Sequence, residues 1–189
     1  QSCPLTLDKL LDHGAKWHPG AEVVTAGDGC NHRIGYSGLR DRARRTSVVL
    51  AGFGIAGGDM VATLAWNTHA HVETWFAVVG MGAVCHTLNP RVGETHLAAM
   101  LGQSGARVIV ASSDLVPPAQ RIATVAAGVE RILCIDGPVP AETPGPLVEA
   151  LEPLLASAQG DMPWGGVDEN APCGLCFTSG TTGAPKGVT

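Results

Sequence analysis

The fold is decided by the stretch Phe177-Thr178-Ser179-Gly180-Thr181-Thr182-Gly183-Ala184-Pro185-Lys186-Gly187, close to the carboxyl end of this 189-residue chain. The apolar residues that lead into it, from Leu175 to Thr178, predict a short β-strand. The glycines allow positive φ and a close approach of the backbone to a ligand. Successive backbone N–H groups in such a loop bind anions, and a lysine adds a mobile point charge. The stretch therefore predicts a strand that delivers a phosphate-binding loop.

This loop differs from the common P-loop of nucleotide hydrolases. That motif needs Gly-Lys followed by Ser or Thr, whereas here Pro185 precedes Lys186 and Gly187 follows it. The alternative is a flexible surface loop rich in serine, threonine and glycine. The ordering of hydroxyls, glycines and lysine over eleven residues favours the phosphate site.

Upstream of the loop, short apolar runs alternate with segments of helical period. We expect strands over 60–65, 83–87, 107–111, 132–135 and 175–178. We expect helices from Leu7, from Ser37 to about Gly54, and over 71–79, 95–101, 119–127 and 146–158. The runs 22–26 and 32–36, on either side of Gly27-Asp28-Gly29, indicate a hairpin. Repeated strand–helix units predict an α/β fold, with a mainly parallel sheet flanked by helices.

The composition fits one folded domain. Hydrophobic residues make up 45% of the chain and charged residues 15%, which excludes a disordered class. The net charge is −5 and there is no dense basic run, so nucleic acid is excluded as an expected partner. We expect Arg40, Arg42, Arg44 and Arg45 to form a solvated helix face. The proline-rich segment that begins at Gly137 and ends at Pro172 is interpreted as a surface excursion within the domain.

The cysteines lack the spacing of a disulfide framework. They are Cys3, Cys30, Cys85, Cys134, Cys173 and Cys176. We interpret them as reduced, which favours a cytoplasmic protein. The longest apolar stretch, 75–85, is shorter than the roughly 20 residues that a membrane helix needs.

Three other patterns in the sequence have simpler structural interpretations. The run 52–57 matches the dinucleotide fingerprint, but it follows a helix and precedes a strand, so a helix end is favoured. Cys173 and Cys176 have redox-motif spacing, yet they belong to an apolar strand, and buried structural cysteines are expected. His69 and His71 should point in different directions, and His86 is expected to be a satisfied structural histidine.

The complete set of segments resembles the acyl-adenylate-forming superfamily, to which acyl-CoA synthetases, luciferases and peptide-synthetase adenylation domains belong. The loop carries the specific resemblance. The supporting segments are Gly58-Asp59-Met60-Val61-Ala62, Trp75 to Val84, His86-Thr87-Leu88-Asn89-Pro90-Arg91 and Asp168-Glu169-Asn170-Ala171. The His86–Arg91 segment is most similar to the fatty-acyl-CoA synthetase branch.

The resemblance implies a two-step ligase reaction. A carboxylate attacks the α-phosphate of ATP to give acyl-adenylate and pyrophosphate, and coenzyme A then takes the acyl group. It implies that Thr178 binds phosphate and Mg²⁺, with Lys186 reaching the phosphates transiently. The residues expected to wrap the β- and γ-phosphates are Ser179, Gly180, Thr181, Thr182 and Gly183.

The same resemblance places the chain, residues 1–189, in the N-terminal portion of the AMP-binding domain, truncated after the phosphate loop. The adenine-, ribose- and acyl-binding motifs and the C-terminal catalytic lysine should follow it, so no catalytic residue is assigned here. We expect the chain alone to lack ligase activity, and its exposed apolar surfaces to promote association, such as a homodimer. Two alternatives stay open: a synthetase for an aryl or other small carboxylate, and a non-catalytic nucleotide-binding or interaction module.

Overall fold

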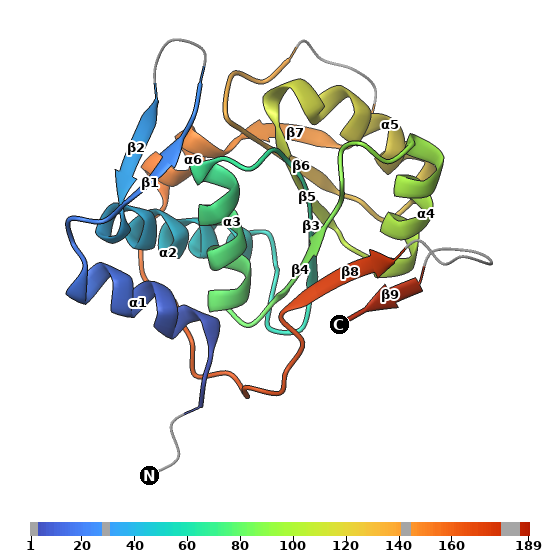
Figure 1. The fold of residues 1–189 in the computed structure, drawn as a ribbon. Coiled ribbons are helices and arrows are strands. Elements are labelled where there is room, and N and C mark those ends of the chain that lie inside the picture. Colours follow the sequence, from blue (N-terminus) through green and yellow to red (C-terminus); the bar gives the residue numbers. More distant parts are fainter. Residues whose placement is uncertain (1–3, 28–30, 141–144, 179–185) are drawn as a thin grey trace.

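A seven-stranded sheet forms the centre of the molecule (Figure 1). The computed structural model describes residues 4–27, 31–140, 145–178 and 186–189. The strand order is β7-β6-β5-β3-β4-β8-β9, and every neighbouring pair is parallel except β8–β9. The strands are β3 (Met60–Leu64), β4 (Val84–Thr87), β5 (Val108–Ser112), β6 (Arg131–Ile135), β7 (Leu147–Ala150), β8 (Gly174–Thr178) and β9 (Lys186–Val188). The predicted α/β class with a mainly parallel sheet is confirmed.

Helices cover both faces of this sheet. On one face lie α2 (Tyr36–Gly52), α3 (His69–Gly80) and α6 (Leu151–Ser157), whose apolar side chains share one core with Val61, Cys85 and Val110. On the other face, α4 (Glu94–Ser104) and α5 (Val116–Ala126), which follows the 3₁₀ turn η1 (Ser113–Leu115), pack on Ala62 and Ile109. The strand residues alternate between the two cores because successive side chains point to opposite faces.

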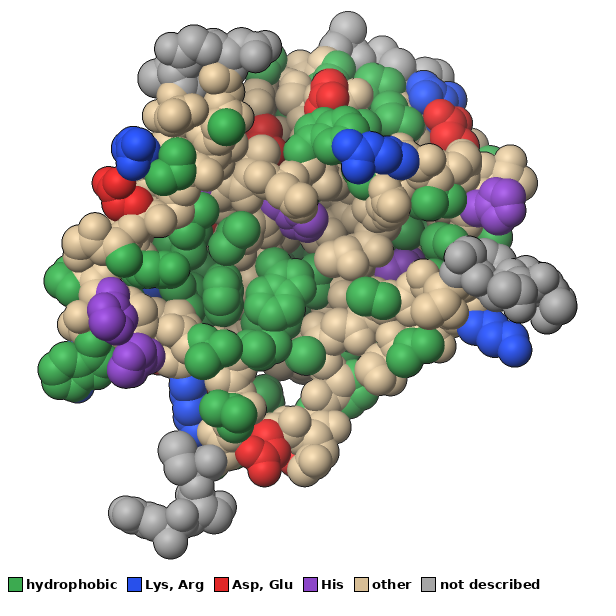
Figure 2. Space-filling view, viewed as in Figure 1, with side chains coloured by type: hydrophobic (Ala, Val, Ile, Leu, Met, Phe, Trp, Pro, Cys, Tyr) green, Lys and Arg blue, Asp and Glu red, His purple; other side chains and the backbone are tan. Residues whose placement is uncertain are grey.

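Two further elements lie outside these layers. Helix α1 (Leu7–Trp17) packs on α2 and α3 through Leu11. Strands β1 (Glu22–Thr25) and β2 (His32–Gly35) pair in antiparallel fashion, as the hairpin prediction required. The hairpin stands beside the start of α3 (Figure 1). Together, α1, α3 and the hairpin enclose an apolar hollow, visible as a green patch in Figure 2.

The direction in which successive strands are added to the sheet reverses around β3. The β3-α3-β4 unit moves toward β8, whereas β4-α4-β5 returns across β3 and continues toward β7. Loops that leave the carboxyl ends of β3 and β5 therefore diverge, and such divergence is where open α/β sheets bind ligands. This edge carries the polar residues described below.

The helix expected over 146–158 is wrong in its first part. Leu147–Ala150 is strand β7, which pairs in parallel with the exposed edge of β6, and only Leu151–Ser157 is helical. Pro146 suits a helix start, but the free backbone groups at the edge of β6 bind this segment as a strand. Because Leu151 and Leu155 are buried in the core, the segment from Gly137 to Pro172 is more than a surface excursion.

The arginines of α2 do not form the solvated helix face that was expected. That expectation was wrong because the carboxylate partners of these arginines come from distant segments of the chain. Arg40, Arg42 and Arg44 are each only 24–30% exposed. Their partners are Asp12 for Arg40, Glu73 and Glu152 for Arg42, and Asp161 for Arg44. These ion pairs tie α2 to α1, α3, α6 and the segment after α6.

Helix boundaries near α2 differ slightly from expectation. The helix begins at Tyr36 with Gly35, not Ser37, as its N-cap, and it ends at Gly52. Gly54, with φ of 75°, lies in the turn that follows, so the run 52–57 is a helix end. Within the described residues, no helix is long and apolar enough to cross a membrane.

Candidate functional site

The ends of the predicted phosphate loop lie beside one another. Strands β8 and β9 are antiparallel neighbours, and Thr178 is the register partner of Lys186. Both residues are exposed at the carboxyl end of β8. Strand β9 was not predicted, and its pairing with β8 brings Lys186 beside Thr178, the last residue of β8. The loop residues Ser179, Gly180, Thr181, Thr182 and Gly183 lie outside the described residues.

Close packing fixes this hairpin to the sheet. Strand β8 pairs with β4 through His86 and Leu175, and the N–H of Cys85 donates to the carbonyl of Cys173 at 3.0 Å. A Cβ added to Gly187 would lie 3.0 Å from Leu175 Cδ1 and 3.3 Å from a Phe177 ring carbon. Since the φ of Gly187 is not in the left-handed region, this glycine serves close packing, not a positive φ.

His86 lies beneath the same hairpin. Its side chain is fully buried, its ring centroid is 5.1 Å from that of Phe177, and neither ring nitrogen has a partner among the described residues. Burial lowers the pKa of His86 to about 4, so the imidazole is neutral. Within the part of the chain that the structure describes, the expectation of a hydrogen-bonded structural histidine is therefore not met.

A cavity of about 420 Å³ opens where β3 and β4 end. Its lining residues are Ala65, Trp66, Asn67, His71, Thr87, Leu88, Asn89, Pro90 and Arg91. The Arg91 side chain is exposed and makes no ion pair within the described part of the chain. Asn89 shapes the turn by accepting from the Arg91 N–H at 3.0 Å. The cavity is therefore lined by one positively charged side chain, Arg91, near the edge of the sheet where β8 leads into the predicted phosphate loop.

His71 forms one wall of this cavity. Its Nδ1 is 3.1 Å from the carbonyl oxygen of Trp66, and its Nε2 is 2.9 Å from Thr63 Oγ1. A carbonyl only accepts, so Nδ1 carries the proton and Nε2 accepts from the threonine hydroxyl. Burial lowers the pKa of His71, which keeps the ring neutral and this pair of bonds intact.

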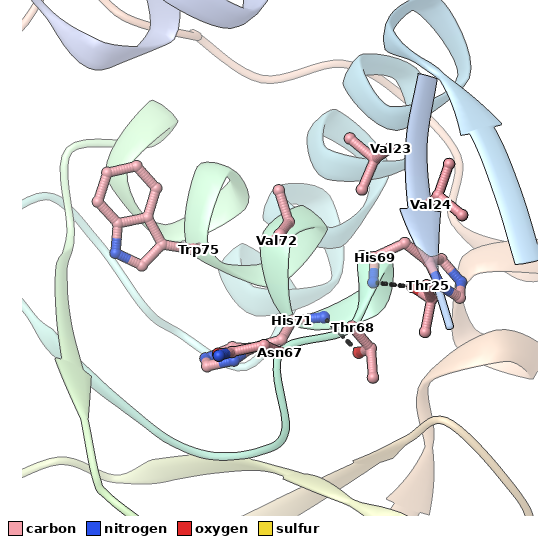
Figure 3. Close-up of a pocket in the computed structure, with 9 residues that line it drawn as sticks. All are labelled: Val23, Val24, Thr25, Asn67, Thr68, His69, His71, Val72 and Trp75. Carbon is pink, nitrogen blue, oxygen red and sulfur yellow. Dashed lines mark hydrogen bonds between the residues drawn. The ribbon is translucent and has the colours of Figure 1, made fainter. Parts of the chain in front are cut away.

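A second cavity, of about 280 Å³, lies on the other side of His71 (Figure 3). It is lined by Val23, Val24, Thr25, Asn67, Thr68, His69, His71, Val72 and Trp75. Asn67 and His71 line both cavities, so they form the wall between them. Figure 3 shows that the residues come from β1 on one side and from α3 and the loop before it on the other.

His69 joins the β1–β2 hairpin to α3. Its backbone N–H donates to Thr25 Oγ1 at 2.7 Å, its Nδ1 lies 3.0 Å from the same oxygen, and its ring stacks on His32 at 3.8 Å. Burial, and next the neighbouring His32, lower the pKa of His69. His69 and His71 therefore contact different partners, and the described residues contain no cluster suited to a metal ion.

The two cysteines of the 173–176 pair are exposed, so the expectation of buried cysteines was wrong for them. In the described residues the face of β8 that carries Cys176 is open, and its Sγ lies 3.9 Å from Thr87 Oγ1. Cys85 and Cys134 are buried and form no disulfide within the described residues. Cys3 and Cys30 lie outside the described residues. The Cys176 thiol is therefore a chemical probe two residues before Thr178.

Sequence reasoning missed most of the cavity residues. Asn67 and Thr68 follow the predicted strand 60–65, and Asp136, which binds Thr68, follows the predicted strand 132–135; polar residues just after strands were the available signal. What could not be foreseen is that β3, β5 and β6 are neighbours, which brings these residues together.

A family model described as AMP-binding enzyme matches residues 11–189. The chain belongs to the AMP-binding enzyme family. It is 35% identical to a 3-methylmercaptopropionyl-CoA ligase of Ruegeria pomeroyi, over 98% of the chain and 35% of that relative. It is 36% identical to a long-chain-fatty-acid–CoA ligase of Thermus thermophilus, over 97% of the chain and 33% of that relative. The chain therefore spans about a third of the length of these relatives.

The fold is also that of a solved family structure. An anthranilate CoA ligase, AuaEII, in complex with anthranoyl-AMP superimposes with a TM-score of 0.85 and 20% identity, over the whole chain and 35% of that protein. The predicted relationship to acyl-adenylate-forming enzymes is confirmed at the level of family and fold.

Proposed function

We propose that this chain supplies the triphosphate-binding hairpin of an ATP-dependent acid–thiol ligase that activates a fatty acid and transfers it to coenzyme A. The observation that carries the proposal is the register of Thr178 with Lys186 at the exposed end of β8. Family membership supports it, since relatives of this chain are CoA ligases. Because the chain spans about a third of those relatives, the complete reaction is proposed for the whole protein.

The first step is nucleophilic substitution at phosphorus. A carboxylate oxygen forms a bond to the α-phosphorus of ATP, the bond from that phosphorus to the bridging oxygen breaks, and pyrophosphate leaves with the electron pair. In the second step, a thiolate sulfur bonds to the acyl carbon and AMP leaves. Groups that neutralise charge on the departing pyrophosphate accelerate the first step. We assign that task to Lys186, the first residue of β9.

Mg²⁺ would supply further charge neutralisation. Magnesium keeps several waters and binds substrate phosphates together with only one or two protein oxygens. The exposed Thr178 hydroxyl fits that requirement as a single protein ligand, and the described residues hold no carboxylate cluster that would form a complete cage. We assign Thr178 as the Mg²⁺ and phosphate contact on this ground.

Binding of Mg-ATP by the chain tests the hairpin directly. Calorimetry should detect weak binding, because phosphate contacts act here without an adenine or ribose site among the residues assigned. Loss of a charge-assisted contact in Lys186→Met should weaken binding about tenfold or more, and Thr178→Val should weaken it less. Lys16→Met removes an equally exposed lysine from α1 and should leave binding unchanged.

A thiol assay provides an independent readout. Alkylation of Cys176 should slow when Mg-ATP is added, since the thiol is exposed beside the hairpin. Equal alkylation rates with and without Mg-ATP, together with no calorimetric signal, would contradict the proposal. Tight binding by the chain alone would favour the non-catalytic nucleotide-binding module instead.

The acid is proposed as a fatty acid from the similarity of the His86–Arg91 segment and from relatives named for fatty acids. An aryl or other small acid is the second candidate, because an anthranilate CoA ligase shares the fold. Adenylation of a panel of acids by the whole protein separates these two. A cytoplasmic location is proposed because the cysteines lack the spacing of a disulfide framework.

Self-association is a further proposal about the apolar surface of Figure 2. The cavity there, of about 380 Å³, is lined mainly by apolar side chains of α1, α2, α3 and β1. Leu10 and Trp17 beside it are 57% and 61% exposed. Apolar surface of this kind promotes association, so light scattering should show species heavier than a monomer. A monodisperse monomer would contradict a homodimer.

A further inference from the structure

Asp136 adopts a backbone conformation that residues with a side chain rarely adopt. It follows β6 at the carboxyl edge of the sheet, and its φ is 63°, in the left-handed region. Among the described residues, the other non-glycine with a positive φ is Ala127, at the end of α5, with φ of 52°. Such conformations persist where the surroundings hold them in place, often next to functional sites.

Two hydroxyl groups hold the Asp136 carboxylate. Its Oδ2 accepts from Thr68 Oγ1 at 2.9 Å and from Ser112 Oγ at 3.0 Å. Ser112 Oγ in turn accepts from the Trp66 N–H at 3.1 Å. The carboxylate therefore joins the loop after β3 to the ends of β5 and β6, at the point where the strand connections diverge.

Thr68 carries this contact into α3. It is the N-cap of the helix, and its Oγ1 accepts from the His71 N–H at 3.3 Å. A hydroxyl has one proton, and Thr68 donates it to Asp136, so its lone pairs face the helix. Asp136 thus orients the hydroxyl that caps the first turn of α3, from which His71 extends.

The residues held in this way form the wall between the two cavities. Asn67 precedes Thr68, and both Asn67 and His71 line the two cavities (Figure 3). Trp66, fixed through Ser112, lines the larger one. A shift of the 66–68 loop would move the side chains of Trp66, Asn67 and His71 together.

We propose that Asp136 is a positioning residue that holds the 66–68 loop and the start of α3, and thereby sets the wall between the two cavities, the larger of which reaches Thr87 next to Cys176 of β8. Its left-handed φ aims the carboxylate at Thr68 and Ser112 from the end of β6. The effect on nucleotide binding rests on the function proposed above; the effect on the loop does not.

Three substitutions separate positioning from simple backbone strain. Asp136→Gly removes the carboxylate and relieves the left-handed φ. Asp136→Asn keeps the shape and tolerates the same φ, but it replaces the charged acceptor with a neutral one. Ala127→Gly relieves the other left-handed residue away from the cavities, and it is the matched control.

Hydrogen exchange of the Trp66 and His71 amides is the first readout. Loss of a hydrogen bond to a charged group should speed exchange of both amides about tenfold in Asp136→Gly, with a smaller increase in Asp136→Asn. Ala127→Gly should leave both rates unchanged. Unchanged rates in either folded Asp136 variant would overturn the proposal. If Asp136→Gly fails to fold, Asp136→Asn decides.

Mg-ATP affinity is the second readout and separates the two proposals. We expect both Asp136 variants to bind Mg-ATP more weakly than the original chain, by up to about tenfold, while Ala127→Gly binds equally. If the original chain binds no Mg-ATP, the proposed function fails, yet the exchange rates still decide the role of Asp136. Faster exchange with unchanged Mg-ATP affinity would overturn the link between the wall and the nucleotide.

Discussion

Replacement of Arg42 by methionine tests the ion pair that joins α2 to α3. The Glu73 side chain is 0% exposed, and its Oε1 accepts from Arg42 Nε at 2.8 Å. Its Oε2 has no partner in the described part of the chain. Burial raises the pKa of Glu73 even though Arg42 lowers it in part. Arg42→Met keeps the volume of the side-chain stem but leaves a buried carboxylate alone.

The expected loss is large. Removing one partner of a buried ion pair costs about 3–5 kcal/mol, because the remaining charge is neither solvated nor compensated. The second partner of Arg42, Glu152, is 67% exposed, so its loss should add less than about 1 kcal/mol. We expect about 3 kcal/mol or more at neutral pH, a large share of the 5–15 kcal/mol typical of a domain.

The pH dependence identifies the cause. A carboxyl whose folded pKa is raised binds more protons in the folded than in the unfolded state. Its contribution to stability therefore improves as pH falls through the folded pKa. In Arg42→Met the pKa of Glu73 should rise further, so the loss should be largest at about pH 7 and smaller at about pH 5.

Urea unfolding of four variants at both pH values makes the measurement. Arg42→Met/Glu73→Leu should recover most of the loss, because an apolar pair replaces the buried charge. Arg33→Met removes an exposed pair with Glu22 and should cost less than about 1 kcal/mol. Glu73→Leu alone completes the double-mutant cycle. A loss below about 1 kcal/mol in Arg42→Met, or a loss that does not shrink in acid, would refute the reasoning.

Three further outcomes are expected. In Gly80→Ala the new Cβ would lie 2.5 Å from the Trp164 ring, so thermal unfolding should show a loss of about 1–3 kcal/mol, and unchanged stability would contradict this packing. The pKa of His86 is about 4 in the folded state, against 6.5 in the unfolded state, so the free energy of unfolding should fall by about 3 kcal/mol as pH drops through that window. His86→Leu should flatten this fall. An equal slope in both proteins would count against a neutral buried ring. Burial raises the pKa of Cys85 to about 12, so after alkylation of the folded chain, mass spectrometry should find label on the exposed Cys176 and little on Cys85. Equal labelling of the two cysteines would contradict this prediction.

Much of the element order followed from hydrophobic pattern. The strands at 60–65 and 107–111 were foreseen because runs this short, rich in β-branched and apolar residues and bounded by turn residues, favour a strand over a helix. The same local logic failed at Leu147–Ala150, where a helix signal at Pro146 was overruled by pairing with β6. Strand β9 could not be foreseen, since its partner β8 lies across the loop.

The site divides in the same way. Thr178 and Lys186 could be proposed as phosphate contacts from sequence alone, because the pattern of a phosphate loop lies in consecutive residues. Three features could not be anticipated: the buried neutral ring of His86, which has no partner among the described residues, the shared wall of Asn67 and His71, and the Arg42–Glu73 pair. Each depends on which distant segments become neighbours.

By itself, the sequence determined the alternation of strands and helices and the family, and it supplied the residues proposed to bind a triphosphate. These are local properties: periodicity, turn residues and the ordering of hydroxyls, glycines and lysine. Only the tertiary structure decided that Asp136 meets Thr68, 68 positions earlier in the chain, and that Glu73 is buried against Arg42. The strand order β6-β5-β3 and the packing of α2 on α3 create those contacts, and no local pattern in the sequence encodes either.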